Sequence, residues 1–291
     1  MIVTYTLLAL SICAVWLPSV RLAGRFNLPP WLALFGCAVA SGLITGHLQP
    51  LAIVSLGVFL LLAYLATRPY ASRAPRMVFG TLTALVALAL AIHRLPGFNN
   101  PVLITAVQFS TDAAPFTLRA NFDKGAVGLL LLALFCRRAG SRAEWAGMLR
   151  KTTPIAICTI VGVLSVASGI GFVRPEFKLP AELWIFLSVN LFFTVVAEEA
   201  LFRGFLQARL AGALASVKFG SAIAVSVSAL LFGLAHFGGG LAYVGLATLA
   251  GLGYAIAYAR TQRIESAILM HFLLNAVHFV GFTFPFIKPS L

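Results

Sequence analysis

The chain alternates between long apolar runs and short stretches that carry most of its charged residues. A helix that crosses the hydrocarbon core of a bilayer needs about 20 apolar residues, with a usual range of about 17–25. The pattern therefore predicts an all-α fold, a polytopic transmembrane helical bundle with about ten spans. The predicted spans are Ile2–Val20, Pro30–Gly46, Pro50–Thr67, Met77–His93, Gly125–Cys136, Pro154–Phe172, Leu183–Leu206, Ser221–Phe237, Leu241–Ala259 and Ile264–Phe282.

Two segments depart from this regular pattern. The fifth predicted span, Gly125–Cys136, would reach only about 18 Å at 1.5 Å per residue, so we expect it to thin the bilayer, snorkel its flanks or re-enter. The connection from Arg94 to Lys124 is too long for a simple turn, and its apolar stretch Val102–Val107 is too short to span. We therefore expect this connection to be functional or partly re-entrant.

The composition supports a membrane protein. Hydrophobic residues make up 60% of the 291 residues and charged residues only 10%, whereas soluble domains have about 45–50% apolar and about 25% charged residues. The net charge of +13 would suggest nucleic acid binding in a soluble protein. In a membrane protein it is better explained by basic cytoplasmic loops, so we expect a lipid bilayer as partner and no nucleic acid.

The distribution of Lys and Arg predicts the orientation. Fifteen of the 21 basic residues lie in one set of alternate loops between the ten predicted spans, when Arg203 in the last turn of the seventh span is counted with the loop that follows it. Because positive loops prefer the cytoplasm, both termini should lie outside it. We expect an integral, multi-pass protein of a bacterial inner membrane.

Two acidic residues lie inside an apolar run, where a charge is costly and indicates function. These are Glu198 and Glu199, and the helical spacing lets Arg203 pair with Glu199, leaving Glu198 on a neighbouring face with no built-in partner. The other acids lie in loops or at span ends, where this cost is avoided: Asp112, Asp123, Glu144, Glu176, Glu182 and Glu265.

Three histidines and an asparagine lie in the apolar segments that follow. His236 is four residues after Phe232, His271 is four residues before Asn275, and His278 continues the His271 face. A lone buried histidine is more often structural, but the nearby acidic pair weakens that interpretation. At 1.5 Å per residue the candidate groups fall in the middle of the membrane, so they could meet.

These groups suit peptide-bond hydrolysis within the membrane. Glu198 can take a proton from a water molecule that His236 helps to position, which creates a nucleophile for an amide carbonyl. An imidazole N–H and a carboxamide can then stabilise the tetrahedral oxyanion, and His271 with Asn275 fits this role.

A zinc mechanism is the alternative. Glu198, His236 and His271 have the right donor types for a catalytic zinc, but the chain has no His-Glu-x-x-His motif. We therefore prefer metal-free hydrolysis with no cofactor and keep zinc as the alternative.

The same residues carry a family resemblance. Three motifs occur in order on three apolar segments: Glu198-Glu199-x-x-x-Arg203, Phe232-x-x-x-His236 and His271-x-x-x-Asn275. This set resembles the CAAX-protease and bacteriocin-processing (CPBP) family, which includes the type II CAAX prenyl endopeptidases. The motifs lie within residues 183–282, so we assign residues 154–291 to a catalytic transmembrane domain and residues 1–153 to an N-terminal region of about five spans with no recognised motif.

The resemblance implies the same residue roles. Glu198 would be the water-activating base beside His236, Glu199 and Arg203 would shape the site, and His271 with Asn275 would stabilise the oxyanion. The substrate would be a protein or peptide with an apolar segment. Two other functions remain open: a non-catalytic immunity or scaffold protein that uses the polar groups for packing, and, less favoured, a proton-coupled transporter.

Overall fold

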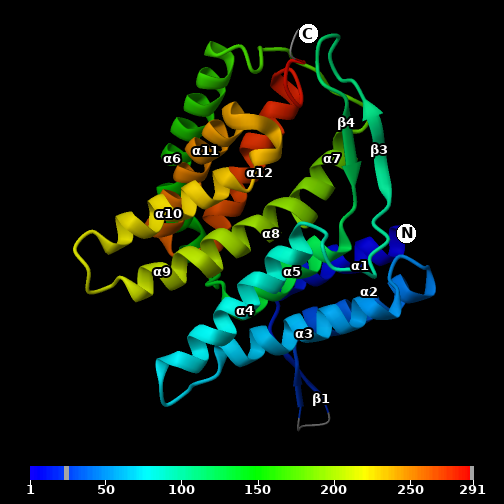
Figure 1. Ribbon diagram of the computed structural model, residues 1–291, viewed down its shortest axis with the longest axis vertical. Helices are drawn as coiled ribbons and strands as arrows, with labels where there is room; N and C mark the ends of the chain where they lie inside the picture. Colours follow the sequence, from blue (N-terminus) through cyan, green and yellow to red (C-terminus); the bar gives the residue numbers. More distant parts are fainter. Residues whose placement is uncertain (23–25, 289–291) are drawn as a thin grey trace. The chain divides into compact units, whose positions relative to one another are not determined.

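The computed structural model describes residues 1–22 and 26–288. These residues form an all-α helical protein with two small two-stranded sheets (Figure 1). They divide into two units. Unit 1 comprises Met1–Pro101, Arg119–Cys136 and Phe192–Leu201, and unit 2 comprises Val102–Leu118, Arg137–Leu191 and the chain from Phe202 onward.

Unit 1 is built mainly from helix pairs. Its elements are α1 (Ile2–Cys13), η1 (Ala14–Trp16), β1 (Val20–Leu22), β2 (Phe26–Leu28), α2 (Pro30–Ile44), α3 (Pro50–Thr67), α4 (Arg73–Ala91), α5 (Phe122–Phe135) and α8 (Val196–Glu199). Helix α1 packs against α2, and α3 packs against α4 (Figure 1). Pro30 and Pro50 begin α2 and α3, because a proline at the first helical position loses no intrahelical hydrogen bond.

The short helix α5 is enclosed by other helices of unit 1. It packs against α1, α3, α4 and α8, and Phe122, Ala126 and Leu129–Leu132 are fully buried. A helix surrounded by protein does not have to match the bilayer thickness. Packing thus accounts for its shortness without the thinning or re-entry that we expected, and its crossing of the membrane stays a prediction.

Unit 2 is organised around a long small-residue helix. Its elements are β3 (Val102–Val107), β4 (Phe116–Arg119), α6 (Arg142–Gly169), α7 (Leu183–Val189), η2 (Asn190–Val195), η3 (Ala200–Gln207), α9 (Ala208–Ala213), α10 (Gly220–Leu234), η4 (Phe237–Gly239), α11 (Gly240–Thr261) and α12 (Ile264–Gly281), although parts of β4, η2 and η3 belong to unit 1. Helix α11 packs against α6, α10 and α12. Gly253 lies against Thr159 of α6 so closely that a Cβ would collide with it, so α11 and α6 approach tightly there.

Most predicted spans coincide with helices, but several ends differ. The first span ends as a helix at Cys13 and continues as a 3-10 turn to Trp16. Helix α6 begins at Arg142 and carries Pro154 inside it, whereas we predicted a start at Pro154. The predicted start is too late because the first turns of α6 contain charged residues, and the prediction was based on apolar runs.

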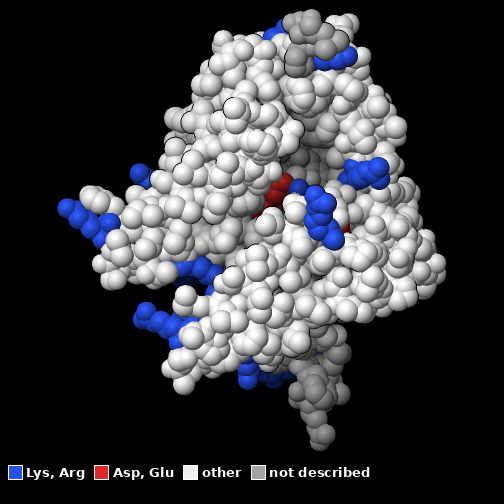
Figure 2. Space-filling view, viewed as in Figure 1, with Lys and Arg blue, Asp and Glu red and all other residues white. Residues whose placement is uncertain are grey.

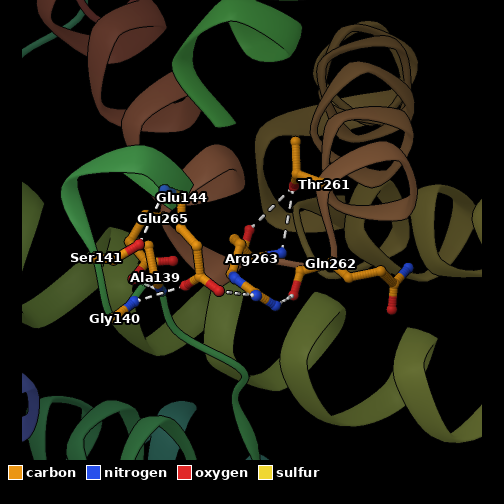
Figure 3. Close-up of polar contacts among 8 residues, drawn as sticks. All are labelled: Ala139, Gly140, Ser141, Glu144, Thr261, Gln262, Arg263 and Glu265. Atoms are coloured by element: carbon orange, nitrogen blue, oxygen red, sulfur yellow. Dashed lines mark hydrogen bonds and ion pairs between the residues drawn. The ribbon is translucent and has the colours of Figure 1, made fainter. Parts of the chain in front are cut away.

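The start of α6 is held by a polar cluster (Figure 3). The Ser141 hydroxyl caps the helix by accepting from the Glu144 N–H at 3.2 Å. The Glu144 carboxylate accepts from the Gly140 N–H at 2.8 Å and from Arg263, in the turn between α11 and α12, at 2.8 Å. These contacts tie three helix ends of unit 2 together.

Two of the acids that we expected at span ends are buried in the protein. Asp123 is 1% exposed and is held by His93 at 2.7 Å and the Asn100 amide at 3.0 Å, all in unit 1. Glu265 is 3% exposed and accepts from the Ala139 N–H at 2.8 Å, both in unit 2 (Figure 3). Both acids lie in the first turn of a helix, as expected, and these hydrogen bonds satisfy carboxylates that water does not reach.

The long connection before α5 forms a hairpin of β3 and β4. Phe116 of β4 packs against Phe186 of α7 and against Phe284, with ring centroids 6.0 and 4.9 Å apart. Phe186 also stacks on Phe279 of α12 at 4.0 Å. Aromatic packing therefore holds the hairpin against α7, α12 and the segment after α12 within unit 2.

Six helices are long and apolar enough to cross a membrane among the described residues: Pro50–Thr67, Arg73–Ala91, Arg142–Gly169, Leu183–Ala213, Phe237–Thr261 and Ile264–Gly281. Three further apolar helices are shorter: Ile2–Trp16, Pro30–Ile44 and Gly220–Leu234. Charged side chains occupy little of the face shown in Figure 2, and most of those are basic. The chain has the composition of a multi-pass membrane protein, and the count of ten spans stays a prediction.

The helix that carries the acidic pair is irregular. Residues Leu183–Ala213 form one apolar helix, which extends past the predicted end at Leu206. Two of its stretches, Asn190–Val195 and Ala200–Gln207, have π-helical hydrogen bonding, and the short α8 with both glutamates lies between them. π-helical turns are rare and are frequent at functional sites.

Candidate active site

Unit 2 contains a cavity that brings together three of the predicted residues. It has a volume of about 70 Å³, and its polar lining comes from His236, His271, Asn275 and His278. The remaining lining is apolar or aromatic: Val163, Leu164, Ala167, Phe172, Val173, Phe232, Tyr243, Leu246, Ala247, Ala250, Tyr254 and Leu274. Because a water molecule needs about 10–15 Å³ of such space, the cavity has room for a few waters.

His236 enters the cavity from a turn and not from a helix. Helix α10 ends at Leu234, before the Gly238-Gly239-Gly240 run, and His236 precedes the 3-10 turn Phe237–Gly239. Its Nδ1 lies 2.8 Å from the carbonyl oxygen of Phe232. A carbonyl can only accept, so Nδ1 carries the proton and Nε2 of the neutral ring is the acceptor. We predicted a helical position because the apolar run continues past the point where the glycines end the helix.

His271 is fixed by aromatic packing. It lies on α12, is 5% exposed, and stacks on Tyr254 of α11 with ring centroids 4.8 Å apart. The ring of Phe232 lies 5.5 Å from His271 and 4.7 Å from His236. The Phe232 ring therefore lies against both imidazoles.

Asn275 has a partner that sequence spacing did not reveal. Its side-chain Nδ2 donates to Oδ1 of Asn190 at 3.3 Å, and Asn190 is buried at the start of the first π-helical stretch. The polar Asn190 inside an apolar run could have been identified from the sequence as a candidate site residue. Nothing in the sequence indicates that its partner is Asn275 on α12. The contact fixes which way the Asn275 amide points.

Arg203 supports the aromatic wall of the cavity. It is fully buried, its guanidinium lies 4.4 Å from the Phe232 ring centroid and 5.3 Å from that of Tyr254, and it donates to the Gly251 carbonyl at 3.0 Å. Cation–π contacts of this kind strengthen when they are shielded from water. The predicted pairing of Arg203 with Glu199 stays a prediction.

The acidic pair belongs to unit 1. Glu199 is fully buried on α8. Glu198 accepts from the ammonium of Lys124 on α5 at 2.6 Å, and the two side chains are 14% and 16% exposed. The expectation that Glu198 has no built-in partner is therefore wrong. We missed Lys124 because it is 74 residues away in the chain and stands at the edge of a predicted span.

Metal coordination is the alternative chemistry for the predicted site residues. Within residues 1–22 and 26–288, no group of three or more His, Cys, Asp or Glu side chains is arranged to hold a metal ion. The preference for metal-free hydrolysis stays a prediction.

Comparison with known proteins finds one family match, which covers about a third of the chain. No curated protein and no solved structure matches the chain. Residues 180–277 match the family described as Type II CAAX prenyl endopeptidase Rce1-like, and this range contains all six predicted site residues. The match confirms the resemblance to CAAX proteases over these residues and supports a CAAX-type intramembrane protease function in a multi-pass membrane protein.

Proposed function

We propose that the protein is a metal-free, glutamate-dependent intramembrane endopeptidase. Glu198 removes a proton from a water molecule that His236 helps to position, and the resulting hydroxide attacks the carbonyl carbon of a peptide bond. The tautomer assigned to His236 leaves Nε2 as an acceptor for a water hydrogen. This nitrogen can therefore orient the attacking water.

The tetrahedral intermediate requires hydrogen-bond donors for its oxyanion. His271 and Asn275 provide an imidazole N–H and an amide N–H from one face of α12. Transfer of the proton from Glu198 to the departing nitrogen then breaks the C–N bond and releases an amine and a carboxylate. The packing of His271 on Tyr254 and the contact of Asn275 with Asn190 hold these donors in place.

One observation carries the proposal: His236, His271 and Asn275 line a single cavity. They come from two segments more than thirty residues apart in the chain, and a packing role does not require polar side chains to converge on open space. The role of Glu198 is argued from its chemistry and from its motif within the matched residues.

The substrate we propose is a peptide with an apolar segment that reaches the site from the bilayer. The apolar lining of the cavity suits such a group. The description of the matched family adds a specific probe, an internally quenched peptide that carries a prenylated CAAX end.

The test compares variants reconstituted in proteoliposomes. Glu198→Gln and His236→Ala should each lower kcat for the probe peptide by about 10²–10⁴-fold, the range for loss of general acid–base catalysis. Glu182→Gln, which changes an acid at the start of the same helix, should keep wild-type activity. Thermal unfolding of each variant checks that it is folded.

Retention of wild-type activity by Glu198→Gln would contradict the proposal and favour the scaffold function, because a neutral amide keeps hydrogen bonds but cannot act as a base. The zinc alternative is tested by the same probe after chelation and metal analysis of the purified protein. We expect activity to persist without stoichiometric metal, and a loss that added zinc restores would replace the proposed mechanism.

A further inference from the structure

Lys124 forms a largely buried ion pair with Glu198, whereas most lysine side chains are exposed to solvent. The nitrogen and oxygen of the pair are 2.6 Å apart, and both side chains are largely buried in unit 1. A charge in an apolar segment is costly unless an opposite charge or a hydrogen bond balances it. The Lys124 ammonium therefore contacts the Glu198 carboxylate in place of most of the water that would surround it at the surface.

The packing of α5 against α8 makes this short contact possible. A Cβ at Gly128 would lie 2.9 Å from both the backbone nitrogen and the Cα of Ala197, so only a glycine lets the two helices approach this closely. Lys124 and Gly128 are four residues apart on one face of α5, and Ala197 precedes Glu198 on α8. The glycine thus sets the separation that lets Lys124 reach Glu198.

The neighbouring acid on α5 does not compete for the lysine. Asp123 is held by His93 at 2.7 Å and by Asn100 at 3.0 Å. These two contacts direct its carboxylate to the residues that precede α5. The ammonium of Lys124, the next residue, pairs with Glu198.

We infer that Lys124 is a positioning residue for the water-activating carboxylate, which rests on the proposed function of Glu198 as the base. A bound ammonium balances the negative charge of Glu198 and fixes the orientation of its carboxylate plane. Substrate affinity should depend little on this contact, whereas the rate of the chemical step should depend on it strongly.

The experiment separates kcat from KM for the prenylated probe peptide. Lys124→Met should lower kcat by about 10–100-fold and leave KM within about threefold, because a misplaced base affects the transition state more than binding. Lys151→Met is the matched control, since it removes one exposed lysine from α6. It should retain wild-type kcat and KM.

Chemical rescue tests the ammonium itself. Lys124→Cys should lose activity as Lys124→Met does, and treatment with 2-bromoethylamine should restore at least a tenth of the wild-type kcat by rebuilding an ammonium at nearly the same distance. Wild-type protein treated in parallel controls for modification of its own four cysteines. Lys124→Arg offers a second route to rescue that needs no reagent.

The outcomes distinguish this inference from the proposed function. A Lys124→Met kcat at or above the wild-type value, or a loss confined to KM, would overturn the role of Lys124 while an inactive Glu198→Gln left the proposed function standing. Failure of both rescues in folded protein would also overturn it. If Glu198→Gln were fully active, both proposals would fall together.

Discussion

Asn190 and Lys124 show how single buried residues in this protein depend on distant parts of the chain. Asn190 meets Asn275 across 85 residues, and Lys124 meets Glu198 across 74. A buried polar group needs a hydrogen-bond partner, and here that partner comes from another helix. Asn275 and Glu198 therefore each have a partner that their own motifs do not contain.

The Asn190 contact leads to a prediction at this scale. Asn190→Ala removes the acceptor that orients the Asn275 amide, so the oxyanion donor should be present but poorly aimed. We expect kcat for the probe peptide to fall about tenfold, less than the 10²–10³-fold expected for removing an oxyanion donor outright in Asn275→Ala. Steady-state kinetics of the two variants, side by side, make the comparison.

Asn99→Ala is a suitable control for this variant. The Asn99 amide also makes one side-chain hydrogen bond, to the Gly46 carbonyl at 2.8 Å, but it is exposed and belongs to unit 1. Its removal should leave kcat unchanged. An Asn190→Ala enzyme with wild-type kcat would show that the Asn275 amide is oriented by other means.

At the scale of elements, the approach of α5 to α8 is controlled by one glycine. Gly128→Ala would place a methyl group 2.9 Å from the backbone of Ala197, which cannot move as a side chain could. We expect a loss of about 1–3 kcal/mol in the free energy of unfolding, as for other overpacked sites. The loss should appear as a lower melting temperature in detergent or lipid.

The control for this prediction is another helical glycine. A Cβ at Gly162 of α6 meets nothing within 4 Å, so Gly162→Ala should be neutral or stabilising by up to about 1 kcal/mol. Equal melting temperatures for Gly128→Ala and Gly162→Ala would mean that α5 and α8 can move apart with no loss in the free energy of unfolding.

The sequence predicted the positions of the helices better than their ends and types. Apolar length is a local property, so Pro50–Thr67 was predicted with the ends that the structure has. The end of α10 was missed because Ala235-His236-Phe237 continues the apolar run into a glycine-rich turn. The π-helical stretches were missed because spacing arguments assume 3.6 residues per turn.

At the scale of the whole molecule, the loop charges predict a testable orientation. Lys218 lies between α9 and α10, and Lys288 lies after α12, so three helices separate them. A reporter enzyme that is active only outside the cytoplasm should be active when fused after Lys288 and inactive when fused after Lys218 in bacterial cells. The reverse result would invert the orientation derived from the basic loops.

The motifs were predictable from the sequence, and their supporting structure was not. Residue types and helical spacing were enough to select His236, His271 and Asn275, which line one cavity. The residues that hold two of them were not predicted: Tyr254 stacks on His271, and Asn190 accepts a hydrogen bond from Asn275. The Lys124 contact likewise depends on how closely two helices approach, which no local pattern encodes.

The π-helical stretch after Glu199 makes this part of the chain sensitive to its length. Arg203 and Gln207 reach the carbonyls of Gly251 and Ala255 on α11 from within this stretch. Deleting one residue between Glu199 and Arg203 would rotate the rest of the stretch about the helix axis and turn both groups away from those acceptors. Deletion of a single codon here would thus break two buried hydrogen bonds at once, and we expect it to destabilise the protein more than most substitutions on the same face.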